Sequence, residues 1–429
     1  MVMKVNKVFF YNATNNLKRS LLSFTEKVTK GLKKTEFKFV FQMLYGMMVA
    51  QDCKLSKIAE ALKEPMELKW THTRLQRNLH DFDKQEVLQE NYMQKVVKNC
   101  RKDTNIIIDN GDIAKPYGTK FEGLCRVHDG STDKIEKGFP TVGIIALTED
   151  KLPLPVYENI YSFDSPDFES INKETFKGLD FVDKYFVKEN FRVFDRGYDS
   201  KIVTGKLLES GVKFIVRAND VRMVIHKGKK ENILNVAKQF KGKYSMKFER
   251  ENGQKADCKI WITPIKLPNF PNEDLNLVIC NGFGKNPMML ITNVFDDDKK
   301  ICRTIVKCYL MRWKIEEFYR FKKVQFNFEG IRVLTLKSMN TLNLLLNILI
   351  GFLAMKSTNK SDKPLIIHLI NQTKRLFEAK NCLYAVCDGI QVCFGKVNLG
   401  VHHYFKKPPW NQLSFFDNFN RYRLCCDFL

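Results

Sequence analysis

The segment from Tyr309 to Lys323 has the densest set of residues in this sequence that could do chemistry. A helix advances by about 100° per residue. Folded as a helix, the segment would place four side chains on one face: Tyr309, Arg312, Glu316 and Lys323. A carboxylate flanked along one face by arginine and lysine suits a metal ligand beside a phosphate backbone. The alternative is a solvated face of Glu–Arg and Glu–Lys pairs, and the aromatic rings of Tyr309 and Trp313 on the same face argue against it.

The elements that must position this face begin near residue 105, where short apolar segments predict strands. The strand segments are NIIID, TVGIIALTED and PLPVYENIYS, then FRVFD and VKFIVRA, and the second and third are expected to form a hairpin near residues 150–152. Helical segments separate the last three. This order is expected of a ribonuclease H-like mixed sheet. The first and fourth strands each end in an aspartate, Asp109 and Asp195, and active sites of open α/β sheets collect at strand ends.

Strand-like alternation continues from about residue 219 to 295, with a hairpin turn expected at Asn252–Gly253. A long helix is expected to follow, from about Lys299 to Lys323. The strand-rich block interrupts the α/β pattern, so we interpret it as an insertion.

Residues 16 to about 100 show helical periodicity. Ser56 could cap a helix over KIAEAL, and Glu64 with Pro65 would end it before a second helix over THTRLQRNLHDF. Two interpretations stay open. The pair is either a helix-turn-helix with Arg74 and Arg77 facing DNA, or an ordinary helical pair with a solvated basic face.

The charge balance favours a polyanionic partner. Lysine and arginine number 71 against 48 acidic residues, a formal net charge of +23, which indicates nucleic acid before membrane. Codon bias in an AT-rich genome is the alternative source of the lysines. No signal peptide is indicated. The longest apolar stretch, Met339 to Met355, is interrupted by asparagines and falls short of the roughly 20 residues that span a bilayer, so we expect a buried helix.

The twelve cysteines show no regular framework, which favours reduced thiols. Two groups could be metal ligands, namely Cys302 with Cys308, and Cys382 with Cys387 and Cys393. Neither has the paired spacing of structural zinc sites, so we expect core cysteines.

The spacing Tyr-x2-Arg-x3-Glu-x6-Lys resembles the signature of the YREK branch, or insertion-sequence-four family, of bacterial DDE transposases. The resemblance covers roughly residues 100–355. It implies that Asp109, Asp195 and Glu316 are the three catalytic carboxylates. It also implies that Tyr309, Arg312 and Lys323 bind transposon-end DNA. Asn110–Gly111 departs from the acidic and hydroxyl residues often found after the first aspartate, which makes Asp112 a competitor for Asp109.

The resemblance implies metal-dependent DNA cleavage at transposon ends and strand transfer into target DNA, within a dimeric synaptic complex. Three clustered carboxylates repel one another, each pair by about 4 kcal/mol at 4 Å in an effective dielectric near 20. Two Mg²⁺ or Mn²⁺ ions would relieve this repulsion and act on the attacking and leaving oxygens. Asp109 would bridge both ions, Asp195 would hold one and Glu316 the other.

Three alternatives remain beside an active transposase. The chain could be a domesticated relative that binds DNA without cutting it, or a nuclease of the same fold without strand transfer. A tyrosine recombinase is disfavoured, because His402–Tyr404 lacks the surrounding arginines and histidines that such a site needs. Further phosphate contacts are expected from four basic residues: Lys115, Lys120, Arg196 and Arg320. The expected location is the bacterial cytoplasm, at the nucleoid.

We therefore predict five segments. They are a helical DNA-binding domain over residues 1–100, the first part of a ribonuclease H-like catalytic core over 101–218, a β-rich insertion over 219–296, the second part of the core with the glutamate helix over 297–356, and a helical C-terminal region over 357–429.

Overall fold

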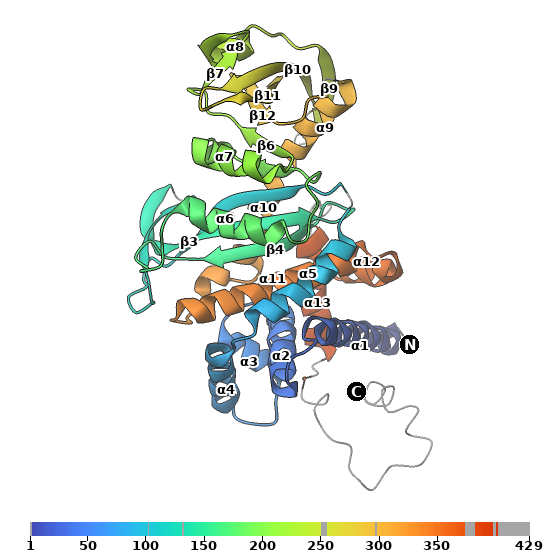
Figure 1. The fold of residues 1–429 in the computed structure, drawn as a ribbon. Coiled ribbons are helices and arrows are strands. Elements are labelled where there is room, and N and C mark those ends of the chain that lie inside the picture. The colour runs from blue at the N-terminus through green and yellow to red at the C-terminus, as the bar shows by residue number, and fades with distance from the viewer. Residues whose placement is uncertain are drawn as a thin grey trace.

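A mixed sheet runs through the upper and middle parts of the molecule in Figure 1, and helices pack below and around it. The computed structural model describes residues 2–101, 103–130, 133–249, 255–296, 298–373, 382–397 and 400–401. Among these residues the sheet has twelve strands. The predicted mixed α/β class is therefore confirmed.

Five central strands come from the segment in which strands and helices alternate. The first three pair antiparallel and are β1 (Ile106–Ala114), β3 (Lys134–Leu147) and β4 (Pro153–Ile160). Two short parallel strands follow, β5 (Arg192–Phe194) beside β1 and β6 (Phe214–Arg217) beside β5. The hairpin expected near residues 150–152 joins β3 to β4 and is confirmed. One strand absent from the prediction, β2 (Cys125–Asp129), pairs with β3.

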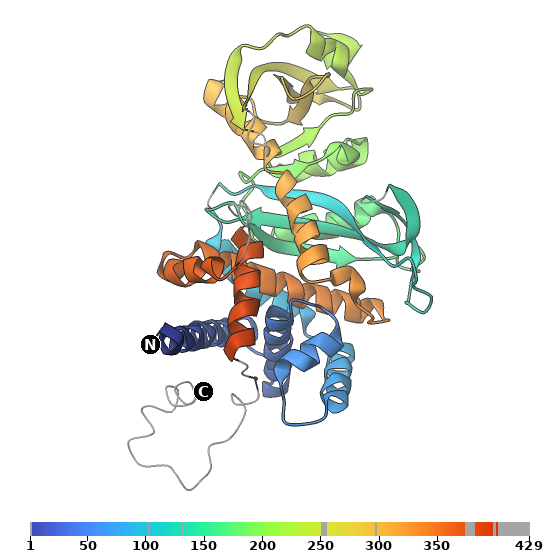
Figure 2. The ribbon, with the colours of Figure 1, turned by 180° about the vertical axis from the view of Figure 1, so that it is seen from behind.

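The helices between these strands begin at serine caps. Ser170 precedes α6 (Ile171–Val182) and Ser200 precedes α7 (Lys201–Ser210), and each hydroxyl accepts a hydrogen bond from the backbone N–H three residues later. This bond satisfies one of the N–H groups that a helix leaves free at its start. The sheet lies between α6 on one face and α10 (Trp313–Gln325) on the other, as the two views in Figures 1 and 2 show.

The strand-rich segment after β6 extends the same sheet. Its elements are β7 (Met223–His226), β8 (Lys229–Asn232), α8 (Ile233–Lys238), β9 (Tyr244–Glu249), β10 (Lys255–Leu267), β11 (Phe270–Asn281) and β12 (Met288–Thr292). The sheet order is β2-β3-β1-β5-β6-β12-β11-β10-β7-β8, with β4 on β3 and β9 on β10. The last strand of the segment, β12, thus pairs with β6 and joins it to the central strands. Asn252–Gly253 lies outside the described residues, although β9 and β10 pair antiparallel on either side of it.

The helix expected from Lys299 to Lys323 is two helices, so that prediction is wrong. α9 (Lys299–Leu310) ends before Met311, and α10 begins at Trp313. Around the break the backbone bonds span three residues, from Arg312 N–H to the Tyr309 carbonyl and from Ile315 N–H to the Arg312 carbonyl. No glycine or proline lies at the break, so no local signal in the sequence indicates it.

Five helices precede the sheet, which confirms the predicted helical N-terminal region. They are α1 (Val2–Val28), α2 (Lys34–Ala50), α3 (Leu55–Leu62), α4 (Leu68–Asp81) and α5 (Gln85–Asn99). As expected, α3 ends before Glu64 and Pro65. Ser56 lies inside α3, whose N-cap is Lys54, so the predicted serine cap is wrong.

The long apolar stretch forms α11 (Leu336–Thr358), which packs beneath the sheet in Figure 1. Among the described residues, α11 is the one helix long and apolar enough to cross a membrane, yet 83% of its most apolar window is buried inside the protein. This confirms the predicted buried helix. The remaining C-terminal elements are η3 (Lys360–Asp362), α12 (Lys363–Asn371) and α13 (Cys382–Val397). The aromatic tail and His402–Tyr404 lie outside the described residues.

Of the cysteines considered as metal ligands, Cys302, Cys387 and Cys393 are buried and Cys308 is partly buried. This agrees with the expected core role.

Candidate active site

Asp109 and Asp195 are brought together by the register of two parallel strands. The pairing of β1 with β5 ends at Ile108 opposite Phe194, so the next residue on each strand is an aspartate. The prediction that Asp109 ends its strand needs correction, because β1 continues to Ala114 in its pairing with β3. The parallel pairing of β1 with β5 is what ends just before Asp109. The carboxylates of Asp109 and Asp195 therefore lie side by side where this pairing ends.

The third acid reaches this edge from α10. Glu316 lies in the first turn of the helix, one turn after Arg312. The Arg312 guanidinium contacts all three acids, with Nη1 2.8 Å from Asp109 Oδ2, Nη2 2.5 Å from Glu316 Oε1 and Nε 3.7 Å from Asp195 Oδ1. The Tyr309 hydroxyl donates a hydrogen bond of 3.1 Å to Asp195 Oδ1. Five predicted residues therefore form one cluster: Asp109, Asp195, Tyr309, Arg312 and Glu316. In the sequence Asp109 is 86 positions from Asp195 and 207 positions from Glu316.

Burial dominates the electrostatics of Asp109. Desolvation raises the pKa of this carboxyl to about 7; Arg312 acts in the opposite direction, while the charges of Asp195 and Glu316 add to the rise. Burial also lowers the pKa of Arg312, but the three acids outweigh it and hold that pKa above its ordinary value. The guanidinium is therefore a permanent cation at the centre of the cluster.

The contacts between α10 and β1 continue beyond the cluster. The Tyr319 hydroxyl donates a 2.9 Å hydrogen bond to the backbone carbonyl of Asp109. Lys323 Nζ lies 2.8 Å from Asp112 Oδ2 and 3.0 Å from Glu329 Oε1. Asp112 is thus paired with Lys323 and separate from the acids around Arg312. This geometry favours Asp109 over Asp112 as the member of the acid cluster.

Sequence reasoning missed Tyr319 and the two glycines beneath its ring. Gly143 pairs with Asp109 across β1 and β3, and a Cβ atom built on it would lie 2.3 Å from the Tyr319 hydroxyl. A Cβ atom on Gly111 would lie 3.1 Å from the same ring. Glycine at both positions lets the ring approach the sheet closely. For Gly143 the available signal was a glycine inside a strand segment, which often marks such an approach, whereas Gly111 lies beyond the predicted end of the first strand.

The other basic residues that were predicted to contact phosphate differ in how exposed their side chains are. Arg320 is exposed on α10, with its guanidinium 5.7 Å from the centre of the Trp313 ring. Arg77 and Lys120 are exposed, and Arg196 lies 3.6 Å from Asp220.

Two of the predicted contacts are engaged inside the protein. Arg74 donates to Gln42 on α2 at 2.6 Å and to Glu64, between α3 and α4, at 2.5 Å, and so ties the middle of α4 to both. Lys115 is buried, and its ammonium donates to the backbone carbonyls of Glu329 and Ile331. In this structure acceptors within the protein bind the cationic groups of Arg74 and Lys115, so DNA would have to replace those partners before either residue could contact a phosphate.

The donor set suits a hard divalent cation. Carboxylate oxygens are the ligands that Mg²⁺ and Mn²⁺ prefer, and three acids lie within reach of one guanidinium. Within the part of the chain that the structure describes, however, no group of three or more His, Cys, Asp or Glu residues is spaced to hold a metal ion as it stands. The guanidinium lies between the acids, so the residues fit a metal in type while Arg312 keeps them apart.

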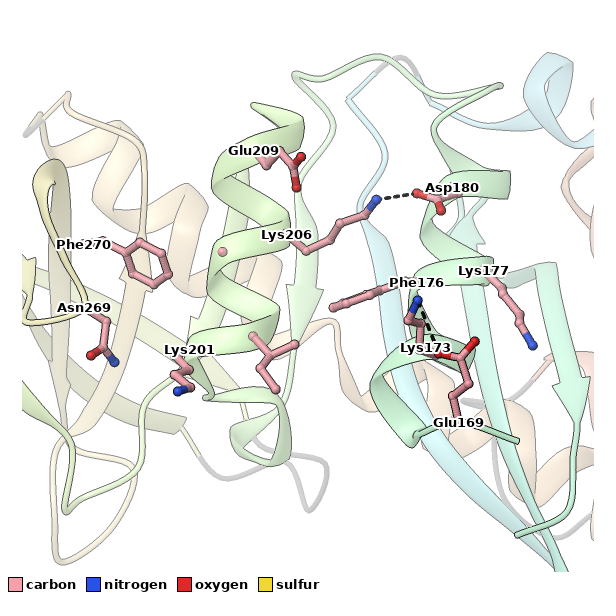
Figure 3. Close-up of a pocket in the computed structure, with 12 residues that line it drawn as sticks. Glu169, Lys173, Phe176, Lys177, Asp180, Lys201, Lys206, Glu209, Asn269 and Phe270 are labelled. Carbon is pink, nitrogen blue, oxygen red and sulfur yellow. Dashed lines mark ion pairs between the residues drawn. The ribbon is translucent and has the colours of Figure 1, made fainter. Parts of the chain in front are cut away.

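A separate groove of about 960 Å³ lies between α6 and α7 and is also lined by Asn269 and Phe270 (Figure 3). It contains none of the clustered acids. Lys206 on α7 pairs with Asp180 on α6 across the groove at 2.8 Å, and Lys173 pairs with Glu169 on the α6 side at 3.4 Å. This balanced charge distinguishes the groove from the acid cluster.

Comparison with known proteins gives an independent assignment. The family model described as "Transposase DDE domain" matches residues 126–352, a span that includes Asp195 and Glu316 and begins after Asp109. Among solved structures, the chain is similar to a piggyBac transposase seen by cryo-EM in a synaptic complex with hairpin DNA. That similarity has 10% identity and a TM-score of 0.44, over 96% of this chain and 84% of that chain. No curated protein matches the chain in sequence. Because the family match spans more than half of the chain, the chain belongs to the transposase DDE domain family and is a transposase.

Proposed function

We propose that this transposase cuts DNA at transposon ends and transfers the cut strand into target DNA, by metal-dependent chemistry at Asp109, Asp195 and Glu316. One observation carries the proposal. Three acids from distant parts of the chain meet at a single guanidinium, at the edge where two parallel strands end their pairing. The resemblance to DDE transposases implies that divalent metal ions take part.

The strand order supports a ribonuclease H-like core. The run β4-β3-β1-β5-β6 has three antiparallel strands followed by two parallel ones. This is the order of a ribonuclease H-like sheet, in which the first and fourth strands lie side by side. Their neighbouring positions here bear Asp109 and Asp195. On this proposal the segment over residues 219–296 is an insertion that continues the sheet at β6.

The chemistry supplied by a bound pair of Mg²⁺ or Mn²⁺ ions is activation of a water or 3′-hydroxyl and stabilisation of the leaving oxygen. Asp109, the most buried acid of the cluster, would contact both ions, and Asp195 and Glu316 would each hold one. Tyr309 positions Asp195 through its hydroxyl. No covalent bond between protein and DNA is required, so Tyr309 has no nucleophilic role.

The spacing from Tyr309 to Lys323 supports membership of the YREK branch. In this interpretation Arg312, Arg320 and Lys323 contact the DNA backbone, and Tyr309 lies against the transposon end. Lys323 is paired with two acids in the protein alone, so DNA would have to replace those partners.

The partners proposed are transposon-end and target duplex DNA, bound within a homodimer in the bacterial cytoplasm. In the helical region over residues 1–100, Arg77 would contact DNA. In the first core segment, Lys120 and Arg196 would add further contacts. The net charge of +23 supports a polyanionic partner.

The test is a nicking assay on a supercoiled plasmid that carries the encoding gene with its flanking DNA, in Mg²⁺ or Mn²⁺. Asp195→Asn and Glu316→Gln should abolish nicking while DNA binding persists. Glu317→Gln is the matched control, because Glu317 is adjacent in sequence but pairs with Lys314 at 2.6 Å. Normal nicking by either of the first two variants would exclude that residue from catalysis.

A second comparison decides between the two candidate first acids. Asp109→Asn should abolish nicking, whereas Asp112→Asn should retain it, because Asp112 is held by Lys323 away from the cluster. The reverse result would reassign the first acid. Wild-type binding without nicking would favour a domesticated relative. Nicking without joining of pre-cut ends would favour a nuclease.

A further inference from the structure

Arg312 occupies the position that the three acids share. Its three guanidinium nitrogens face three carboxylates on β1, on the turn after β5 and on α10. The side chain is only 14% exposed. Arginine is not deprotonated in proteins, so the positive charge cannot be removed without moving the side chain.

A divalent ion and this guanidinium need the same oxygens. Asp109 Oδ2 and Glu316 Oε1 both direct lone pairs at Arg312, at 2.8 Å and 2.5 Å. A Mg²⁺ ion demands oxygen ligands at about 2.1 Å in near-octahedral geometry, which the inserted guanidinium prevents. The acids can converge on a metal only after Arg312 has withdrawn.

A place for the withdrawn side chain lies beside the cluster. Arg312 also lines a cavity of about 310 Å³, together with Arg217, Tyr309, Trp313 and Asn286. Arg217 is hydrogen-bonded to the Tyr309 side chain, whose hydroxyl donates to Asp195. Two guanidinium groups and an amide on one cavity suit a tetrahedral oxyanion such as a backbone phosphate.

Resting on the proposed function, we propose that Arg312 is the internal cation of the acid cluster, competes there with the divalent metal, and is drawn into the Arg217 cavity when a phosphate group enters it. The residue thus positions the acids before metal binds. Phosphate and metal then bind cooperatively, since each favours the same withdrawn position of Arg312.

The test measures Mn²⁺ binding to the full chain without DNA, from the loss of the free Mn²⁺ signal in electron paramagnetic resonance. Arg312→Ala should bind Mn²⁺ roughly ten-fold or more tightly than wild type, because a competing charge a few ångströms from the metal is removed. Arg312→Lys should lie between them, since one ammonium cannot span three acids. Arg332→Ala removes an equal charge from an exposed position to which no role in the site is assigned, and it should change the Mn²⁺ affinity by less than about two-fold.

A thermal melt adds a readout that a merely structural role would not give. In EDTA, Arg312→Ala should melt below wild type because three acids lose their counter-ion. Mn²⁺ should then raise its melting temperature by more than it raises that of wild type. Unchanged or weaker Mn²⁺ binding by Arg312→Ala, with Arg312→Lys folded and equal to wild type, would overturn the proposal.

Sulfate tests the cavity as the phosphate position. At constant ionic strength, replacing chloride by sulfate should raise the Mn²⁺ affinity of wild type, and Arg217→Ala should lose this increase. An equal increase in both proteins would refute release into the cavity. Failure of the proposed function has a different signature, because Glu316→Gln and Asp195→Asn would then bind Mn²⁺ as wild type does.

Discussion

Replacing Gly143 with alanine should displace the Tyr319 ring and so weaken its hydrogen bond to the backbone of Asp109. Gly143 lies opposite Asp109 in the register of β3 with β1. A Cβ atom there would be 2.3 Å from the Tyr319 hydroxyl and 3.0 Å from its Cζ atom. Real Cβ atoms do not approach so closely, so the ring or the strand must shift. Either shift breaks or strains the hydrogen bond from Tyr319 to the Asp109 carbonyl.

The magnitude follows from the atoms involved. Overpacking of this kind costs about 1–3 kcal/mol, and removal of the hydroxyl alone in Tyr319→Phe costs about 1 kcal/mol as a lost hydrogen bond. In the double variant the closest atom is gone and the nearest remaining contact is Cζ at 3.0 Å. Tyr319→Phe should therefore cost little, or even stabilise, in the Gly143→Ala background. We expect a coupling of about 1–2 kcal/mol.

Urea denaturation of the four proteins in EDTA measures this cycle. Gly395→Ala is the control, because nothing lies within 4 Å of a Cβ atom built there and the residue is in α13. It should be neutral or stabilising by up to about 1 kcal/mol, the difference in helix propensity between glycine and alanine. Additive effects of Gly143→Ala and Tyr319→Phe would refute the direct contact between ring and strand.

Three further predictions concern charged groups that contacts within the protein hold. The folded-state pKa of Asp109, about 7, lies above its ordinary 3.8, so the free energy of unfolding of metal-free protein should fall as pH rises from about 4 to 7. The cost, complete above pH 7, is about 4 kcal/mol. Urea titrations should show no such component in Asp109→Asn, and a flat wild-type curve would contradict it. Lys322→Met should lower the free energy of unfolding by about 3–5 kcal/mol, because it leaves the buried Glu158 without its cation. Urea denaturation should show that adding Glu158→Gln recovers part of this lost stability. Fully additive effects of the two substitutions would refute the pairing. Arg74→Ala should lower the melting temperature, because its contacts with Gln42 and Glu64 are lost. Arg77→Ala should leave the melting temperature unchanged and reduce, by about 1, the slope of log duplex affinity against log salt concentration. A reduced slope in Arg74→Ala would contradict a purely structural role for Arg74.

Much of the strand and helix pattern could be predicted because each signal was local. Runs such as Ile106–Ile108 are apolar at consecutive positions and are bounded by polar residues, which is typical of a strand buried on both faces. Serine caps were a poorer guide, because the predicted cap Ser56 lies inside α3 whereas Ser170 and Ser200, which do cap helices, were not predicted. The strand β2 was missed because its residues Cys125–Asp129 alternate apolar and charged over only five positions, too short a run to distinguish from a loop.

The position of the acid cluster required more than local signals. Asp109 and Asp195 become neighbours through a three-pair parallel register, and a register depends on which strands meet and not on either segment alone. The resemblance in the segment from Tyr309 to Lys323 supplied that missing information. The hydrogen bonds of Arg74 and Lys115 could not be predicted from the sequence, because their acceptors lie on other segments of the chain.

The break between α9 and α10 changes what the spacing from Tyr309 to Lys323 means physically. On one straight helix, Tyr309, Arg312 and Glu316 would be neighbours on a single face. In the structure the chain turns at Met311–Arg312, so Tyr309 approaches Asp195 from α9 while Glu316 approaches from α10. Arg312 lies at the junction and can contact acids on both sides of it. The spacing from Tyr309 to Lys323 is thus better explained by a bent junction that surrounds one guanidinium than by a continuous helical face.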